Sequence, residues 1–103
     1  MTRILELHPA ALAEAEAAAA WYAERNPQAA AAFTLELDDA IAELEREPHV
    51  HPSYEHGTRR VLLGRFPFSV VYRFDAARVL IIAFAHASRR PGYWAERLAG
   101  GPG

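Results

Sequence analysis

The sequence has no cysteine, no lysine and no long apolar segment. Without cysteine the chain can form no disulfide, no thiolate metal site and no cysteine nucleophile. No apolar run approaches the ~20 residues that span a bilayer, and we therefore expect a cytoplasmic protein. All eleven basic residues are arginines, whose planar guanidinium groups favour bidentate contacts with carboxylates and phosphates.

The apolar content is sufficient for one globular domain. Of the 103 residues, 51% are hydrophobic, and a chain of this length buries roughly two-thirds of its unfolded surface when it folds. We expect a single domain over residues 1–98. The glycine-rich end, residues 99–103, is predicted to be a flexible tail.

The net charge of −2 conceals an uneven distribution along the chain. Residues 1–56 hold three arginines and eleven acidic residues, a formal charge of −8, whereas residues 57–103 hold eight arginines and two acidic residues, a formal charge of +6. This asymmetry predicts a basic face on the second half of the chain. That face is either ordinary solvated charge or a surface for an anionic partner, an RNA backbone or an acidic protein segment.

The first half of the chain predicts one strand followed by two helices. Residues 2–8 alternate loosely in polarity, as a strand does, and the alanine-rich residues 9–25 predict a helix that begins at Pro9. Asn26 is a helix cap, and Pro27 occupies the first turn of a second helix. So short a turn makes the two helices an antiparallel hairpin. The buried stripe of the second helix is predicted to contain Ala30, Phe33, Leu37, Ile41 and Leu44.

The second half predicts three strands and a short helix after a loop at residues 48–58. The strands are predicted at residues 59–63, 68–74 and 78–86. The last is apolar almost throughout, which predicts a central strand buried on both faces. Pro91 opens a short terminal helix, and Trp21 and Tyr72 are expected in the core or on a sheet face. The fold class is therefore α+β: an N-terminal strand, a helical hairpin, a three-stranded antiparallel sheet and a C-terminal helix.

Three histidines gather in the loop before the strands. His49 and His51 alternate and His56 follows, and alternate histidines can converge on one metal ion. Prolines flank the loop, however, and no residue nearby in sequence is placed to orient the rings. We interpret the loop as exposed and polar, and expect neither a metal ion nor a cofactor.

A set of arginines, one histidine and one tyrosine in the second half has the chemistry of a phosphate site. Arg65 precedes one strand, whereas His86 and Arg89 follow the end of another, so antiparallel pairing could bring them to one edge of the sheet. Cleaving RNA without a metal needs a base for the 2′-hydroxyl, an acid for the leaving 5′-oxygen and cations on the phosphate. Histidine and arginine can fill these roles. The full set is Arg59, Arg60, Arg65, Arg73, His86, Arg89, Arg90 and Tyr93.

Two motifs in this half resemble a known family. Residues 65–74 read R-F-P-F-S-V-V-Y-R-F and residues 86–94 read H-A-S-R-R-P-G-Y-W. They are similar to the R-F-P-[YF]-x-[VI]-x-Y and H-x-x-R-x-P-x-x-W motifs of the RelE/ParE toxin superfamily, the plasmid stabilisation proteins of type II toxin-antitoxin systems. Together with the order of one strand and then two helices, the resemblance covers residues 3–98. It implies the RelE/ParE toxin fold.

The resemblance implies a toxin nearer to ParE than to RelE, one that inhibits DNA gyrase and is neutralised by a cognate small antitoxin, ParD-like or RelB-like. The acidic C-terminal segment of such an antitoxin docks as a helix in a groove or adds a strand to the sheet. On this interpretation Arg59, Arg60, Arg73 and Arg90 contact the antitoxin or the target, and His86 is a strand-end residue that hydrogen bonds across the fold. The slightly acidic, lysine-free composition favours it, because docking on a ribosome is largely electrostatic.

The alternative that the resemblance implies is a RelE-like, ribosome-dependent mRNA endoribonuclease. Its catalytic residues would be His86 as general acid or base, Arg65 and Arg89 on the phosphate, and Tyr93 positioning a base. A second alternative is an inactive family member. Whether the chain is an enzyme, and whether it forms homo- or hetero-oligomers, stays open among these interpretations.

Overall fold

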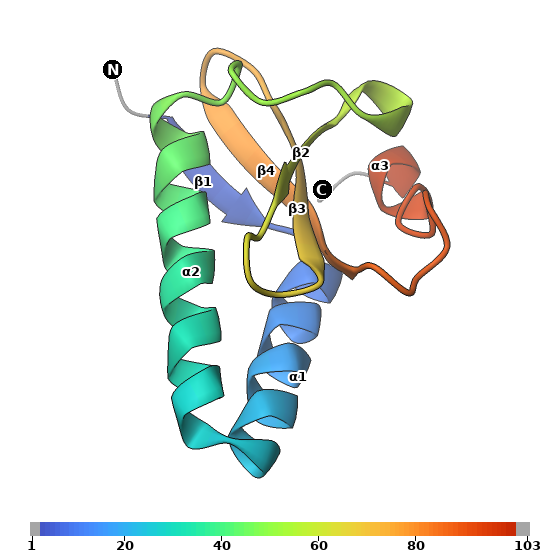
Figure 1. Cartoon of the computed structure of the whole chain (residues 1–103). Helices are drawn as coiled ribbons and strands as arrows, with labels where there is room; N and C mark the ends of the chain where they lie inside the picture. The colour runs from blue at the N-terminus through green and yellow to red at the C-terminus, as the bar shows by residue number, and fades with distance from the viewer. Residues whose placement is uncertain (1–2, 101–103) are drawn as a thin grey trace.

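A helical hairpin covers one face of a sheet, and a short C-terminal helix lies on the other side (Figure 1). The computed structural model describes residues 3–100. Its elements in chain order are β1 (Ile4–Leu7), α1 (Pro9–Arg25), α2 (Pro27–Arg46), the 3-10 turn η1 (Glu55–Gly57), β2 (Arg59–Leu62), β3 (Phe68–Phe74), β4 (Arg78–His86) and α3 (Glu96–Gly100). The predicted α+β order of elements is confirmed.

One residue caps both helices of the hairpin. Asn26 ends α1 by donating its backbone N–H to the Tyr22 carbonyl at 2.7 Å. The same residue starts α2 by accepting the N–H of Gln28 on its Oδ1 at 3.0 Å. Because a single residue satisfies groups at both helix ends, the chain reverses direction there without an intervening loop.

The sheet is mixed, with strand order β1-β4-β3-β2. The three later strands pair antiparallel as predicted, and β1 completes the sheet by pairing parallel to β4. Strand β4 is therefore central, with a neighbour on each side. Residues 79–84 are all buried, which confirms the prediction from the apolar run.

A β-bulge in β4 changes which residues face each side of the sheet. Val71 pairs with Ala83 and Tyr72 pairs with Ile81, so Ile82 has no partner on β3. Ile82 and Ala83 consequently both belong to the cluster on the face away from the hairpin.

Two apolar clusters hold the sheet between its covering elements. Beneath the hairpin, the buried side chains include Phe33, Leu37, Leu44, Val70, Tyr72, Ile81 and Phe84. On the opposite face, the buried side chains are Val71, Leu80, Ile82, Ala83 and Trp94. Trp94 packs the C-terminal segment onto the sheet, and Tyr93 and Leu98 pack beside it. Tyr72 is buried as expected, and its hydroxyl donates to the Pro48 carbonyl at 2.5 Å.

Two local expectations are wrong. Trp21 is 52% exposed, because the face of α1 that meets the sheet is occupied by small residues such as Ala11 and Ala18. The terminal helix does not open at Pro91: turns precede α3, and Gly92 has a φ of +78°, which a continuous helix cannot include.

The chain ends predicted from the sequence lie partly outside the described residues. Residues 99–100, which the sequence assigned to the tail, close α3, whereas residues 101–103 and Thr2 of the predicted first strand are not described. None of the helices within residues 3–100 has the length and apolar character needed to cross a bilayer.

Candidate interaction surface

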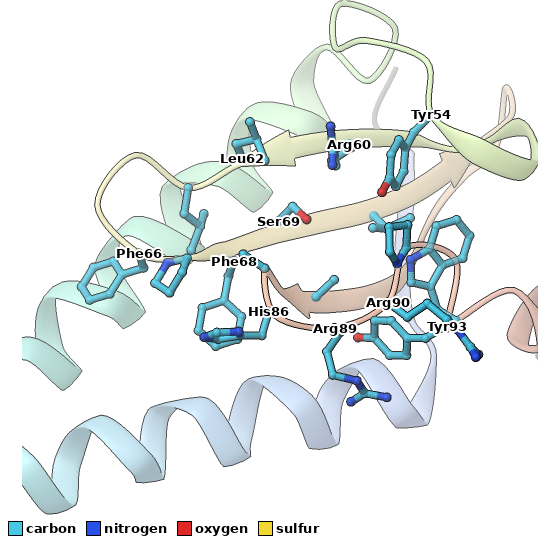
Figure 2. A pocket seen from close by; sticks show the side chains of 17 residues that line it. Tyr54, Arg60, Leu62, Phe66, Phe68, Ser69, His86, Arg89, Arg90 and Tyr93 are labelled. Carbon is cyan, nitrogen blue, oxygen red and sulfur yellow. The ribbon is translucent and has the colours of Figure 1, made fainter.

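Two neighbouring cavities border the end of β4. The first, which we call the sheet-face cavity, measures about 340 Å3 and lies over the face of the sheet away from the hairpin (Figure 2). The second, the α1 cavity, measures about 550 Å3 and lies between α1 and the adjoining ends of β3 and β4. Residues common to both linings are Pro67, Phe68, His86, Arg89 and Tyr93.

His86 lines both cavities, and its imidazole ring is bonded to Ser88 in the loop that follows β4. It pairs with Phe68 across the ladder, and the two rings meet edge to face at 4.9 Å between centroids. Its Nδ1 accepts the backbone N–H of Ser88 at 3.0 Å and lies 2.8 Å from the Ser88 hydroxyl. The expected hydrogen bond across the fold is thus replaced by bonds to a residue two positions away.

Arg65 is separated from His86 by its attachment to α2. Its Nε lies 3.4 Å from Oε1 of Glu36, whose other oxygen accepts the backbone N–H groups of Gly64 and Arg65. The carboxylate thereby fastens the loop between β2 and β3 to the hairpin. Arg65 lines neither of the two cavities.

Tyr93 belongs to a cluster centred on Glu14. The tyrosine hydroxyl donates to Oε2 of Glu14 at 2.6 Å, while Arg97 binds both carboxylate oxygens at 2.8 and 3.0 Å. Oε1 also accepts the N–H of Phe84 at 3.2 Å, beyond the end of the pairing with β1. Burial, and then the bond to Glu14, raise the pKa of Tyr93, so its hydroxyl stays protonated.

Neither Glu14 nor Arg97 was identified from the sequence as part of this region. A signal was present, since Glu14 lies at helical spacing between the buried Ala11 and Ala18 on the face of α1 that meets the sheet. An acidic residue on such a face needs a buried partner. The partner is 83 positions away in sequence and could not be named from the pattern.

The α1 cavity combines an apolar wall with exposed cations. On the α1 side the cavity is lined by the small side chains of Ala17 and Ala18, and the ring of Trp21 beside them is half exposed. The guanidinium carbon of Arg25 lies 3.8 Å from the centre of the Trp21 ring, and that of Arg89 lies 3.9 Å from the Tyr93 ring. The Arg25 guanidinium also donates to the Trp21 carbonyl at 3.0 Å, whereas Arg89 lines the cavity and can offer its guanidinium edge to a carboxylate.

The remaining predicted contact residues divide between the two faces of the sheet. Arg60 and Arg90 line the sheet-face cavity, and the guanidinium of Arg60 stacks on Tyr54 at 4.1 Å. Arg73 alternates with the core residues of β3 and lies in a separate small cavity near Glu6. Arg59 donates to the His51 carbonyl at 2.5 Å and is thereby engaged in holding the loop before β2.

The Glu6 and Asp75 carboxylates, which line the same small cavity as Arg73, are engaged elsewhere. Glu6 forms its ion pair with Arg78 at 3.3 Å. The side chain of Asp75 accepts the N–H groups of Ala77 and Arg78, and these bonds lower its pKa.

The three loop histidines do not converge. His51 lies near Tyr72 and is 3.6 Å from Glu43, whereas His56 packs edge to face on Trp94 at the other side of the sheet. Within the part of the chain that the structure describes, no group of three or more potential ligands is arranged to hold a metal ion.

Comparison with known proteins identifies the family. The profile of the family described as "ParE toxin of type II toxin-antitoxin system, parDE" matches residues 5–91. A chain from a solved structure of the chromosomal ParDE TA system from P. aeruginosa has the same fold: the TM-score is 0.73 at 21% identity, and the match covers 84% of this chain and 98% of that one. A search of curated proteins found no match. The family match spans most of the chain, and the protein therefore belongs to the ParE toxin family of type II toxin-antitoxin systems.

Proposed function

We propose that this toxin stops growth by binding DNA gyrase, and that a ParD-like antitoxin neutralises it in the cytoplasm. The observation that carries the proposal is that the four candidate catalytic side chains do not form one site: Arg65 lines neither cavity, although His86, Arg89 and Tyr93 line both. Arg65 is tied to Glu36 on α2, and the Tyr93 hydroxyl is committed to Glu14. A nuclease site would need these groups to converge on one phosphate, so the arrangement supports a toxin that acts by binding.

The surface around the end of β4 supports binding to a protein partner. Its α1 cavity exposes Trp21, and aromatic and arginine side chains are the residue types that anchor protein interfaces. The nearby cations Arg25 and Arg89 suit an acidic segment. An antitoxin with an acidic C-terminal region would meet complementary charge here.

A metal-independent endoribonuclease is the second candidate function. The observation that favours it is that His86, Arg89 and Tyr93 border both cavities. Three of the four candidate residues are therefore neighbours, although the Tyr93 hydroxyl is already bound.

Inducing the chain in bacteria without an antitoxin, and mapping mRNA 5′ ends, separates these functions. The variants to compare are His86→Ala/Arg89→Ala and a matched control, Arg46→Ala/His49→Ala, at exposed positions in the last turn of α2 and in the turn that follows it. We expect growth arrest by the native chain without new 5′ ends. New ends in codon register that disappear in the His86→Ala/Arg89→Ala variant, and persist in the control, would establish the ribonuclease instead.

A further inference from the structure

The α1 cavity has the size and the walls of a small-molecule site. Its volume of about 550 Å3 lies within the range of ~300 to 1,000 Å3 that is usual for pockets that hold small ligands. The aromatic residues Trp21, Tyr22, Phe68 and Phe84 belong to its lining. Such rings contact a planar ligand edge to face or by offset stacking. The walls therefore favour an aromatic molecule.

Glu14, the acidic residue in this lining, is already compensated by the fold. Its carboxylate accepts hydrogen bonds from the Phe84 N–H and the Tyr93 hydroxyl, and it forms a bidentate pair with Arg97. Because both of its oxygens are engaged and its charge is balanced, Glu14 leaves no demand for a cationic ligand.

Arg89 supplies a positive charge that the fold leaves uncompensated. Its guanidinium stacks on the Tyr93 ring, and the residue is exposed. Within residues 3–100 no carboxylate forms an ion pair with it. A guanidinium that lies flat on a ring keeps its N–H edge for a planar acceptor with two oxygens.

His86 adds a second hydrogen-bond donor to the same cavity. Its Nδ1 accepts the backbone N–H of Ser88 at 3.0 Å, so the neutral imidazole carries its proton on Nε2. No residue that the structure describes is a hydrogen-bond partner of Nε2. His86 and Arg89 line the cavity from the end of β4 and the loop after it, on the side of the sheet towards α1 (Figure 2).

We propose that the α1 cavity binds a small aromatic carboxylate, whose ring lies among the aromatic side chains and whose carboxylate accepts hydrogen bonds from Arg89 and His86. The inference goes beyond the proposed function and does not depend on it. A carboxylate fits better than a nucleoside monophosphate, because a phosphate monoester carries about −1.5 to −2 charges at pH 7. The lining offers only the Arg89 cation against that charge.

The probe is 2-naphthoate. Its two reference ligands are 2-naphthamide, which has the same rings without the charge, and octanoate, which has the charge without the rings. Each compound is titrated into the isotope-labelled full chain, and chemical-shift changes locate the binding site and give the dissociation constant.

Two pairs of variants test the walls and the charge. Ala17→Phe, at an exposed position in the lining, fills the cavity, and Ala13→Phe is its control, exposed on the same helix but outside the lining. Arg89→Gln removes the cation. Its control is Arg90→Gln, at a position that lines the sheet-face cavity but not the α1 cavity.

We expect 2-naphthoate to bind with a dissociation constant of about 1 mM or less, as is usual for a ligand of this size. The largest shifts should fall on Trp21 and Phe84. Both reference ligands should bind at least ~tenfold more weakly than 2-naphthoate. Ala17→Phe and Arg89→Gln should each weaken 2-naphthoate binding at least ~tenfold, whereas the two controls should change it less than ~twofold.

Absence of 2-naphthoate binding up to ~10 mM would overturn the proposal. So would equal binding of 2-naphthoate and 2-naphthamide, or shifts confined to the sheet-face cavity. Tighter binding of uridine monophosphate would assign the cavity to nucleotides instead. The Arg89→Gln variant keeps the test decisive if Ala17→Phe fails to fold. Growth arrest and gyrase inhibition are measured without the ligand, so the proposed function stands or fails separately.

Discussion

At the scale of single residues, Glu14 connects three parts of the chain that are distant in sequence. Its carboxylate receives the backbone N–H of Phe84, the hydroxyl of Tyr93 and both ends of the Arg97 guanidinium. The side chains of Glu14 and Arg97 are only 18% and 17% exposed. Charge-assisted, bidentate bonds in such surroundings are stronger than surface ion pairs. We infer that Glu14 fixes the C-terminal segment against α1.

Replacing Glu14 by glutamine tests this role. The amide keeps the size of the side chain but leaves the Arg97 charge uncompensated, so we expect Glu14→Gln to lower the free energy of unfolding by about 1 to 3 kcal/mol. Urea denaturation measures the change. Glu16→Gln, at an exposed position on the same helix, should change little. Equal effects of the two substitutions would show that the cluster adds no stability.

Two tyrosines with raised pKa values make the free energy of unfolding depend on pH in the alkaline range. Burial raises the pKa of Tyr72 to about 12, and burial with the Glu14 bond raises that of Tyr93. Unfolded tyrosine titrates near pH ~10, so above this pH the folded chain holds more protons than the unfolded chain. The contribution of both tyrosines to the free energy of unfolding is complete below pH ~10, and it is lost as the pH rises through their folded-state pKa values.

We therefore expect the free energy of unfolding to fall as the pH rises above ~10. Urea denaturation across that range should show a shallower decline for Tyr72→Phe/Tyr93→Phe, because its phenylalanines cannot titrate. A decline of unchanged slope in the double variant would assign the alkaline sensitivity to other groups.

At the scale of elements, the hairpin depends on one stripe of α2. Leu37 is 8% exposed and belongs to the core, Ile41 is partly buried against it, and Leu35 is 62% exposed. We expect Leu37→Ala to cost about 2 to 5 kcal/mol of stability, and Ile41→Ala to cost less, because less apolar surface is lost. Leu35→Ala is the matched control and should stay within about 0.5 kcal/mol. Similar losses at Leu35 and Leu37 would contradict the assigned core face.

The elements were predictable because their signals are local. Prolines and Asn26 mark the hairpin ends, and the apolar run of residues 79–84 identifies the central strand. The parallel partner of β1 was not predictable, since its pairing with β4 joins residues more than 70 positions apart. For the same reason the Arg97 partner of Glu14, 83 positions away, could not be predicted. Trp21 was misassigned because residue type alone does not show which face of an alanine-rich helix meets the sheet.

The candidate site was only partly predictable. Antiparallel pairing was predicted to bring Arg65, His86 and Arg89 to one edge of the sheet; His86 and Arg89 line the same two cavities, and Arg65 lines neither. Arg65 lies apart because Glu36 holds its loop against α2, a contact across 29 positions. The roles assigned to these residues remain predictions.

At the scale of the whole molecule, charge is divided between the two halves of the sequence. The acidic residues are concentrated on the helices, whereas Arg60, Arg89 and Arg90 gather around the sheet-face cavity. An acidic partner is attracted to the second surface and repelled by the first, which orients it before contact. The exposed Leu62 lines the sheet-face cavity, the exposed Trp21 lines the α1 cavity, and His86 and Arg89 line both.

The proposed binding to gyrase is tested by measuring the supercoiling activity of purified DNA gyrase while the purified chain is titrated in. A toxin that acts by binding gyrase should reduce supercoiling progressively as its concentration rises. Full supercoiling at concentrations of the native chain that stop growth in cells would show that the toxin does not act on gyrase.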